Sequence, residues 1–386
     1  MKLFKQAEVY SPQYLGTKDV LIAGTKILKI ADELTSFYRD DIEVIDCQGK
    51  ILCPGFVDSL VHITGGGGEG GYSTRTPEMS IEEAIVGGVT TLVGVLGTDS
   101  ITRSLENLLA KSYALEEQGL NVYCHTGSYH LPAVNITGSV TKDIMLIDKF
   151  IGVGEVAIAD HRGSQLTVNE LAKVASEARV GGMLANKSGI VSIHVGDSEE
   201  GVSLIQQVAE ETDIPVTQFY PTHMNRSAEL LEQGISLAKA GGYIDFTTST
   251  NEQILASGEV SAAHAMAIAL DKGVPVSQIT MSSDGNASLP LFDDAGKLVD
   301  LQVGKVASLH ESVVEAILEH NVSIAEAIAS VTQSPADILN LKKGRIVEGV
   351  DADLNVLRAD SFAVEDVYSK GAELMKAGKV VITSHF

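Results

Sequence analysis

Between residues 51 and 283 the sequence repeats one arrangement eight times: a short apolar run of strand type ends in polar residues. Most of the runs are followed by a segment with apolar residues at helical spacing. Parallel strands that alternate with helices form either a closed barrel or an open doubly wound sheet. Eight units predict an α/β fold, a (β/α)8 TIM-like barrel, and the open sheet is the competing architecture. The eight runs are residues 51–63, 90–96, 121–128, 152–159, 190–195, 216–220, 243–248 and 278–283.

Helical spacing predicts the segments between and after these runs. The first has a capping-box pattern, with Ser80 before the helix and Glu83 three residues later. The predicted helices are residues 80–87, 105–117, 168–180, 203–211, 228–240, 260–272, 303–320 and 323–340.

Both ends of the chain lack such helices and read as short β runs separated by turns. In residues 1–50 these runs are 7–10, 19–23, 26–30 and 42–46, and in residues 343–386 they are 345–347, 352–357, 364–369 and 379–383. We expect residues 1–50 and 343–386 to pair into one small β-sandwich domain beside a catalytic barrel of residues 51–342.

Acidic residues outnumber basic ones by 51 to 28, which gives a formal net charge of −23. Such a chain repels phosphate backbones and anionic lipids, so neither a nucleic acid nor a membrane is an expected partner. No stretch approaches the roughly 20 apolar residues that span a bilayer, and residues 1–13 do not read as a secretory signal. The three cysteines are odd in number and widely spaced, which is typical of a reducing compartment. We expect a cytoplasmic protein.

Six of the ten histidines follow or lie near a predicted strand end: His62, His125, His130, His161, His194 and His223. In a barrel these ends meet at one face, where histidines and carboxylates from different strands build metal sites. One such histidine alone would more often hydrogen-bond to loop backbone, so the prediction depends on the set. The expected metal ligands are His62, Glu155, His194, His223 and Asp284.

Two of these ligands are acids with competing interpretations. Glu155 lies within an apolar strand, where a buried carboxylate needs a metal ion or, alternatively, an ion pair with a neighbouring Arg or Lys. Asp284 lies where the eighth strand ends, and it suits a metal ligand that also accepts a proton, or else a simple turn or helix cap.

The glycine-rich loop 65–71 lacks the Lys-Ser/Thr ending of a phosphate-binding loop. Its acid, Glu69, could receive a ligand ammonium group or could be a solvated loop residue. Arg162 and Arg226 closely follow two strands and could bind substrate carboxylates, or each could form a surface salt bridge.

The segments LCPGFVDSLVHITGGGGEGG, LVGVLGTDSITRS, TGSYHLP, AIADHR, PTHMNR, SSDGNAS and EGVDADLNVL resemble the isoaspartyl (β-aspartyl) dipeptidases of the amidohydrolase superfamily. The resemblance covers nearly the whole chain. It implies a metal-dependent hydrolase barrel of the (β/α)8 type, a β domain built from both chain ends, and a homo-oligomer.

The resemblance also implies a zinc metalloprotease that hydrolyses dipeptides in which aspartate is linked through its side-chain carboxyl. A hydroxide held by two zinc ions would attack the carbonyl. His62 would bind the more buried ion, His194 and His223 the other, and Asp284 would be both ligand and proton shuttle. Tyr129 would polarise the carbonyl and Glu69 would bind the substrate α-amino group. The residues implied to orient the substrate carboxylates and amide are Arg162, Arg226, Ser288, Thr98 and the backbone of Gly67.

Two positions depart from the family pattern. Glu155 stands where the family usually has a carboxylated Lys that bridges the two metals, and a carboxylate can bridge as well. Leu60 stands where the superfamily has the first His of a His-x-His motif, and leucine cannot coordinate metal. We therefore expect weaker metal binding at the buried site and reduced activity.

Two other functions fit the same residues. The chain could be a catalytically dead amidohydrolase-like binding protein, or an amidohydrolase for another small amide such as a cyclic ureide or an N-acyl amino acid. Intact positions at Glu69, Tyr129, Arg162, Arg226 and Asp284 speak against the first, and the pairing of Glu69 with two arginines favours a zwitterionic dipeptide over the second.

Overall fold

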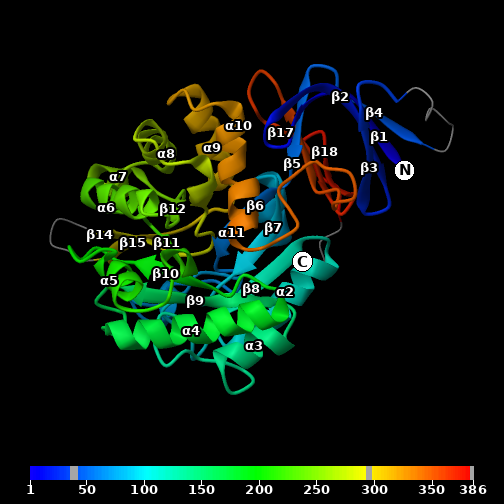
Figure 1. The fold of residues 1–386 in the computed structure, drawn as a ribbon. Coiled ribbons are helices and arrows are strands. Elements are labelled where there is room, and N and C mark those ends of the chain that lie inside the picture. The colour runs from blue at the N-terminus through cyan, green and yellow to red at the C-terminus, as the bar shows by residue number, and fades with distance from the viewer. Residues whose placement is uncertain (35–41, 293–297, 383–386) are drawn as a thin grey trace.

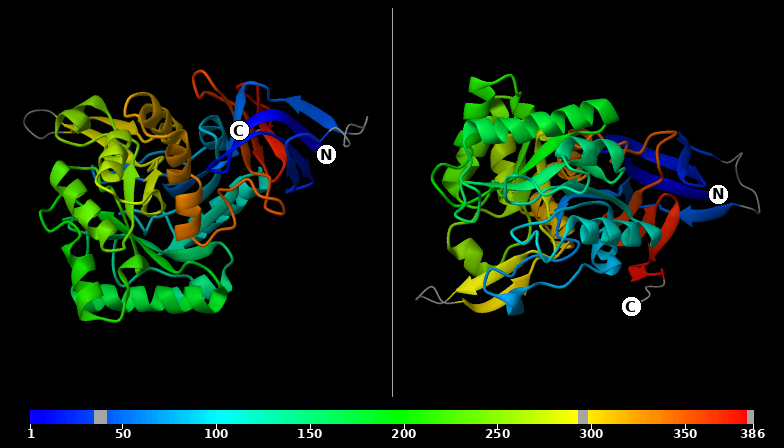
Figure 2. Two further views of the ribbon diagram at one scale, coloured as in Figure 1. Left: turned by 45° about the horizontal axis from the view of Figure 1, so that its top comes forward. Right: turned by 90° about the horizontal axis from the view of Figure 1, so that it is seen from below.

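The computed structural model describes residues 1–34, 42–292 and 298–382, and it consists of a helix-covered barrel with a β-rich body at one side (Figures 1 and 2). The predicted run 379–383 and the histidine at 385 extend beyond the described residues.

Eight parallel strands form the barrel. β6 to β11 make one hydrogen-bonded sheet and β12 pairs with β13. Backbone hydrogen bonds connect the two groups at both seams: Met224 N donates to Asp245 O (3.1 Å), and Asp284 N donates to Leu60 O (3.1 Å). The predicted closed barrel is thus confirmed over the open sheet. Its strands are β6 (Phe56–Val61), β7 (Val89–Gly94), β8 (Asn121–Thr126), β9 (Phe150–Ile158), β10 (Ile190–Val195), β11 (Phe219–Thr222), β12 (Ile244–Thr247) and β13 (Ile279–Ser282).

The predicted helices occur in the predicted order, and two short helices that were not predicted, at 140–146 and 252–256, lie among them. Polar caps begin most of the helices. The capping box of Ser80 and Glu83 is present, and Thr167 forms a second one. The predicted helix 323–340 is wrong as a single element, because the backbone of Thr332 leaves the helical region (φ −135°, ψ −83°) and divides it in two. The helices are α1 (Ile81–Val86), α2 (Leu105–Glu117), α3 (Val140–Leu146), α4 (Val168–Ala185), α5 (Ser203–Glu211), α6 (Ala228–Lys239), α7 (Glu252–Ala256), α8 (Ala262–Asp271), α9 (Ser308–Leu318), α10 (Ile324–Ser330) and α11 (Gln333–Ile338).

The predicted first strand, 51–63, is also two elements. β5 (Lys50–Pro54) belongs to the β-rich body, and β6 begins the barrel after Gly55. A Cβ at Gly55 would lie 2.2 Å from Thr90 Oγ1, so the crossing between the two bodies requires glycine. The apolar run gave no sign of this break, since both strands are fully buried along most of their length.

The β-rich body is one nine-stranded sheet drawn from both chain ends. Phe4 and Tyr368 lie three strands apart in the sheet, yet their rings meet at 4.9 Å, so the sheet curls around a shared core. The predicted run 345–347 is not a strand. The exact domain limits 1–50, 343–386 and 51–342 stay a prediction. The strands are β1 (Lys2–Tyr10), β2 (Tyr14–Ala23), β3 (Lys26–Ala31), β4 (Glu43–Asp46), β5, β16 (Leu354–Arg358), β17 (Val364–Ser369), β18 (Ala372–Lys376) and β19 (Lys379–Val380).

A hairpin that the sequence patterns did not predict follows the eighth barrel strand. β14 (Ser288–Phe292) pairs antiparallel with β15 (Leu298–Val303), so the predicted helix 303–320 begins only at Ser308. Pro290 lacks a backbone N–H donor, which is tolerated in a two-stranded hairpin of this kind because both strands are edge strands.

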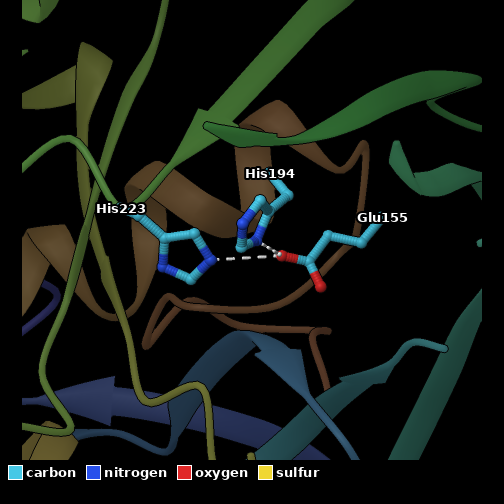
Figure 3. Close-up of side chains that lie close together, drawn as sticks. All are labelled: Glu155, His194 and His223. Atoms are coloured by element: carbon cyan, nitrogen blue, oxygen red, sulfur yellow. Dashed lines mark hydrogen bonds and ion pairs between the residues drawn. The ribbon is translucent and has the colours of Figure 1, made fainter. Parts of the chain in front are cut away.

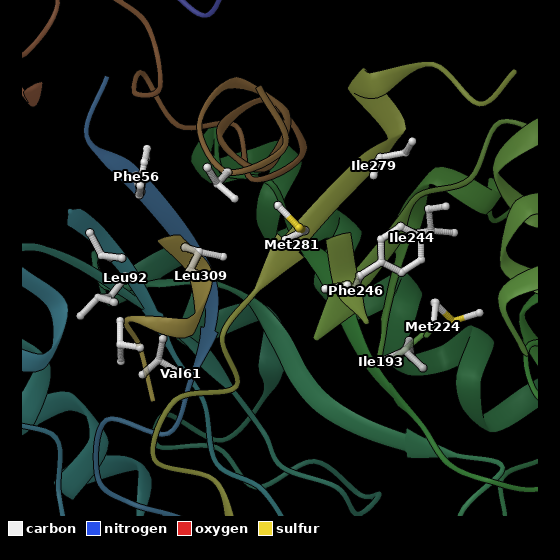
Figure 4. Close-up of a cluster of buried hydrophobic side chains, with 14 of the residues drawn as sticks. Phe56, Val61, Leu92, Ile193, Met224, Ile244, Phe246, Ile279, Met281 and Leu309 are labelled. Atoms are coloured by element: carbon white, nitrogen blue, oxygen red, sulfur yellow. The ribbon is translucent and has the colours of Figure 1, made fainter. Parts of the chain in front are cut away.

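The core has two layers of different character. The side chains that face outward from the barrel strands pack against the helices, as Figure 4 shows for Leu92, Ile193 and Phe246. Inside the barrel, Tyr220 packs with Ile338 and Leu339 of the α11 region. Above this apolar floor the interior becomes polar, so the site lies at the carboxyl ends of the strands.

Two expectations from composition concern the cysteines and membrane-spanning helices. The three cysteines are buried and unpaired. Within residues 1–34, 42–292 and 298–382, no helix combines the length and apolarity needed to cross a membrane.

Candidate metal centre

Three predicted ligands converge at the barrel mouth, as Figure 3 shows: Glu155 on β9, His194 on β10 and His223 just after β11. Glu155 Oε1 lies 3.0 Å from His194 Nδ1 and 3.2 Å from His223 Nε2. All three ligand atoms lie within 4.8 Å of one another and all three residues are buried. Among the described residues this is the one such cluster, and we call it the three-ligand group.

The far side of each imidazole has a polar partner that orients the ring. His223 Nδ1 lies 2.6 Å from Thr247 Oγ1, and His194 Nε2 lies 2.9 Å from Asp160 Oδ2. An ionised Asp160 can only accept, so this contact suits an N–H on His194 Nε2. The other two nitrogens, His194 Nδ1 and His223 Nε2, both face Glu155, so each ring in its neutral form can turn a lone pair toward a bound cation.

The charges in this group favour metal binding. Burial alone would raise the pKa of Glu155, but hydrogen bonds from His194 and His223 hold it well below its usual range. Burial and the nearby Arg226 lower the pKa of His223 to about 4. An ionised carboxylate with neutral imidazoles is the ligand set that zinc takes in proteins.

His62 and Asp284 form a second, looser pair beside this group. His62 Nε2 lies 3.2 Å from Asp284 Oδ1 and 3.6 Å from Glu155 Oε2. Three buried atoms here have no hydrogen-bond partner: His62 Nδ1, Glu155 Oε2 and Asp284 Oδ1. Leu60, only 2% exposed, adds no ligand atom. We call these residues the His62–Asp284 pair.

These unpartnered atoms are the test of whether the residues fit a metal. Buried polar atoms are normally satisfied, and unpaired carboxylate oxygens in a dry site are costly. Two carboxylates and three imidazoles whose free atoms face inward match the donor preferences of zinc and similar divalent ions. The residues present therefore fit a metal centre.

The remaining predicted residues line the cavity above the centre. The predicted residues on its wall, apart from His62, His194 and Asp284, are Gly67, Glu69, Thr98, Tyr129, Arg162, Arg226 and Ser288.

One side of this cavity is acidic. Thr98 Oγ1 donates to Glu69 Oε1 (2.9 Å), and Arg162 lies 3.5 Å from the same oxygen. The loop brings Glu69 there because Gly67 has φ +68°, where a Cβ would lie 2.5 Å from Thr74 O. The Cβ of Ser288, which carries its hydroxyl, lies 3.2 Å from where a Cβ at Gly67 would stand.

The two arginines and Tyr129 line the same cavity. Arg162 stacks over the Tyr129 ring at 5.5 Å, and Arg226 donates to Val195 O (3.0 Å). The Tyr129 hydroxyl lies 2.7 Å from His194 Nδ1. Burial, followed by the charge of Glu155, raises the pKa of Tyr129 well above its usual value, so the phenol remains a proton donor.

Asp160 is a site residue that the sequence interpretation did not assign. Its Oδ2 contacts both His194 Nε2 and Arg162 (2.6 Å), and its side chain is 4% exposed. Burial works against ionisation, but hydrogen bonds from His194 and Arg162 hold the pKa of Asp160 far below its usual range. The signal was present in the segment AIADHR, where an acid follows a buried strand two residues before the predicted Arg162.

Three strand-end histidines lie outside the three-ligand group. His130 and His161 are exposed, and His130 contacts Ser164. His125 is fully buried, and neither of its ring nitrogens has a hydrogen-bond partner.

Comparison with known proteins agrees with this geometry. A sequence model of the amidohydrolase family matches residues 51–381. The solved β-aspartyl dipeptidase of Fervidobacterium islandicum AW-1, in complex with the β-Asp-Leu dipeptide, is 45% identical with a TM-score of 0.93, and the match covers 100% of this chain and 98% of that chain.

Curated relatives are more distant. A dihydroorotase of Streptococcus pneumoniae is 23% identical over 413 residues, covering 96% of this chain and 94% of that enzyme. A dihydroorotase of Staphylococcus epidermidis is 32% identical over 108 residues, so the chain matches 24% of the length of that relative and 28% of its own.

Proposed function

The chain belongs to the β-aspartyl dipeptidase family of the amidohydrolase superfamily, and from that premise we propose that it is a zinc-dependent hydrolase of β-aspartyl dipeptides. One observation supports this substrate most strongly: a carboxylate, Glu69, and two guanidinium groups, Arg162 and Arg226, line one cavity above a His/carboxylate centre. A β-aspartyl dipeptide carries one ammonium group and two carboxylates around its amide, so its charges complement that wall.

Glu69 would bind the substrate α-amino group. Its contact with Thr98 supports this role, because the hydroxyl holds the carboxylate at the cavity wall. Arg162 and Arg226 would bind the two substrate carboxylates, and Ser288, Thr98 and the backbone of Gly67 would orient the amide. In a chain of net charge −23, these two arginines supply the positive potential that an anionic substrate needs.

The metal would be held by Glu155, His194 and His223 on one side and by His62 and Asp284 on the other, with Glu155 between them. A bound divalent ion supplies Lewis-acid chemistry: it lowers the pKa of water to near neutrality and polarises the scissile carbonyl.

The chain's own residues would then move the protons. The Asp284 carboxylate would accept the proton of the attacking water and pass it to the departing amine. The Tyr129 phenol would donate a hydrogen bond to the carbonyl oxygen as negative charge develops there. Both roles are supported by the raised pKa of Tyr129 and the lowered pKa of Asp284, where burial is outweighed by the contact with His62.

Leu60 bears on how active the enzyme is. If no other group replaces the missing imidazole, the His62–Asp284 pair offers only one imidazole and two carboxylate oxygens to its ion. Weak binding at that position and reduced turnover would follow.

The test is a substrate panel on zinc-loaded protein. We expect release of leucine from β-Asp-Leu, and none from α-Asp-Leu, because the α-linked isomer presents its ammonium and carboxylate groups in a different order. Glu69→Gln should raise KM for β-Asp-Leu. Glu199→Gln, at an exposed acid on the wall of the wider cavity that opens outward from the site, should not.

Dihydroorotate, a hydantoin and an N-acetyl amino acid complete the panel, since dihydroorotases are among the relatives. Preferred turnover of a cyclic amide would replace the dipeptidase proposal with the other amidohydrolase function. Absence of turnover on every substrate, with metal bound, would leave the binding-protein function.

A further inference from the structure

His125 is a buried side chain that the proposed function does not use. It is 0% exposed, and neither Nδ1 nor Nε2 has a hydrogen-bond partner. An imidazole has at least one N–H donor and one acceptor or a second donor. Leaving both nitrogens unpaired in a dry interior is destabilising, because each loses its hydrogen bonds to water without replacement. A phenylalanine or leucine would avoid that cost, so the ring calls for a physical explanation.

Strand alternation places His125 inside the barrel. On β8, Val122 and Cys124 belong to the core shared with the helices, whereas Tyr123 packs with the interior floor. His125 is two residues further along the same face, toward the carboxyl end of the strand. It pairs in register with Gly152 of β9, three residues before Glu155. Burial lowers the pKa of His125 to about 4, and Glu155 is the charge near enough to oppose that effect.

The groups around this part of the interior lack complementary partners. Glu155 Oε2 and Asp284 Oδ1 are buried carboxylate oxygens that face only one possible donor, His62 Nε2, at 3.6 and 3.2 Å. Leu60, on β6 two strands away from β8, offers only methyl groups. A neutral His125 adds a further lone pair to a region that already has too many acceptors.

A divalent cation satisfies such a set better than a water molecule does. Water can donate two hydrogens, whereas the two carboxylate oxygens and one imidazole lone pair make three acceptors. A cation binds all three at once and neutralises the carboxylate charge. Since His125 lies outside the three-ligand group, the ion in question is the second one, beside the His62–Asp284 pair.

We propose that His125 is a ligand of the buried metal ion and supplies from β8 the imidazole that Leu60 does not supply from β6. This inference rests on the proposed metal centre, but not on the identity of the substrate. The buried site would then have as many imidazole ligands as in the family pattern, with one of them contributed by β8 and not by β6, and it would not be weakened by Leu60.

The first test is the number of zinc ions per chain, measured by elemental analysis after saturation and removal of free metal. We expect two ions in the unmodified protein, one in His125→Leu, and two again in the double variant Leu60→His/His125→Leu. His310→Leu removes another largely buried imidazole, on α9 and away from the centre, and should retain two ions.

The second test reads ligation directly. In His125→Cys loaded with Co²⁺, a thiolate ligand gives a sulfur-to-cobalt charge-transfer absorption band, which should be absent in His310→Cys. This variant decides the matter if His125→Leu does not fold.

One zinc ion in the unmodified protein, two in His125→Leu, or no charge-transfer band in His125→Cys would overturn the inference. None of these readouts depends on β-Asp-Leu turnover. If the metal counts are as expected but β-Asp-Leu is not hydrolysed, His125 is a ligand and the proposed substrate is wrong. If β-Asp-Leu is hydrolysed but the metal counts differ from those expected, the proposed substrate is right and His125 is not a ligand.

Discussion

The three-ligand group and the His62–Asp284 pair share Glu155 but differ in how the protein holds them. In the first, His194 and His223 each have an outer partner, Asp160 or Thr247, and their ligand atoms lie within 4.8 Å of one another and of Glu155. In the second, His62 Nδ1 has no hydrogen-bond partner, and Glu155 Oε2 and Asp284 Oδ1 face only His62 Nε2, at 3.6 and 3.2 Å.

This difference shows that two metal positions with similar ligand types can differ in how well their ligands are preorganised. Ligands fixed by outer hydrogen bonds are held ready for an ion, and the cost of ordering them is met during folding. Ligands without such contacts gain their full set of interactions only when an ion arrives. We therefore expect the three-ligand group to bind the tighter ion and the His62–Asp284 pair, with His125, to bind the weaker one.

The largest expected effect comes from the residue that both halves share. Glu155→Gln should remove ions from both positions and lower kcat/KM for β-Asp-Leu by at least about 10³-fold, because Lewis-acid activation contributes several kcal/mol. Elemental analysis and steady-state kinetics measure the two quantities. Glu259→Gln, at a half-buried acid on the wall of the wider cavity that opens outward from the site, is the matched control. Retention of both ions in Glu155→Gln would show that Glu155 is not a ligand shared by the two metal positions.

A smaller effect is expected where chemistry is altered but both halves remain. Tyr129→Phe should lower kcat by about 10²–10³-fold, as for loss of one oxyanion donor, with little change in KM. Metal content should remain at two ions. Tyr123→Phe, on the barrel-interior face of β8, controls for loss of a phenol. A loss in metal content equal to the loss in kcat would assign Tyr129 to holding His194 and not to the carbonyl.

Asp160 sharpens the comparison, because it acts on one half alone. Asp160→Asn should weaken zinc binding at the three-ligand group by about 10–100-fold, the range for outer partners of metal-bound histidines. It should also raise KM, since Arg162 loses its carboxylate contact. Competition with a chromophoric chelator measures the first effect. Asp197→Asn, an exposed acid 3.7 Å from Arg226, should change neither. Equal weakening of both ions would show that the halves are not independent.

The smallest expected effect is on stability, and it comes from Asp245, a buried carboxylate whose hydrogen-bond donors are hydroxyl groups. Asp245 accepts from Thr222, Thr280 and Ser282, and burial raises its pKa to about 6. A folded-state pKa above the unfolded value means that stability is lost as pH rises between the two. In metal-free protein, this group should lower the free energy of unfolding by about 1 kcal/mol between pH 5 and pH 7.

Urea denaturation of the protein and of Asp245→Asn at both pH values tests this prediction. The variant should lose that part of the pH dependence, whatever its absolute stability. An unchanged dependence would mean that the hydroxyls hold Asp245 ionised, as a metal ion would.

The sequence predicted most of the barrel because its signals are local. Alternating apolar runs and polar caps such as Ser80 and Thr167 are visible without tertiary contacts, and strand ends such as His194 map to one face by topology alone. The break at Gly55 was invisible, since two strands buried in different bodies read as one apolar run. The division of the last predicted helix at Thr332 was equally hidden, because apolar residues continue on both sides of it.

The site was predictable where a residue type carries its chemistry, and not where its role depends on a neighbour. Asp160 acts through contacts with His194 and Arg162, which are separated from it by different distances along the chain. His125 was singled out as a strand-end histidine, but only its burial without partners distinguishes it from the exposed His130. The positive φ angles of His223 and Asp284, which turn both ligands into the mouth, have no signature in the sequence either.

The most direct measurement is β-Asp-Leu hydrolysis by metal-stripped protein as Zn²⁺ is added in known equivalents per chain. We predict that activity rises until two equivalents are bound and then remains constant, with the tighter ion bound first and supporting less turnover. Full activity at one equivalent would contradict a catalytic role for the His62–Asp284 pair, and no hydrolysis at any metal content would contradict the proposed function itself.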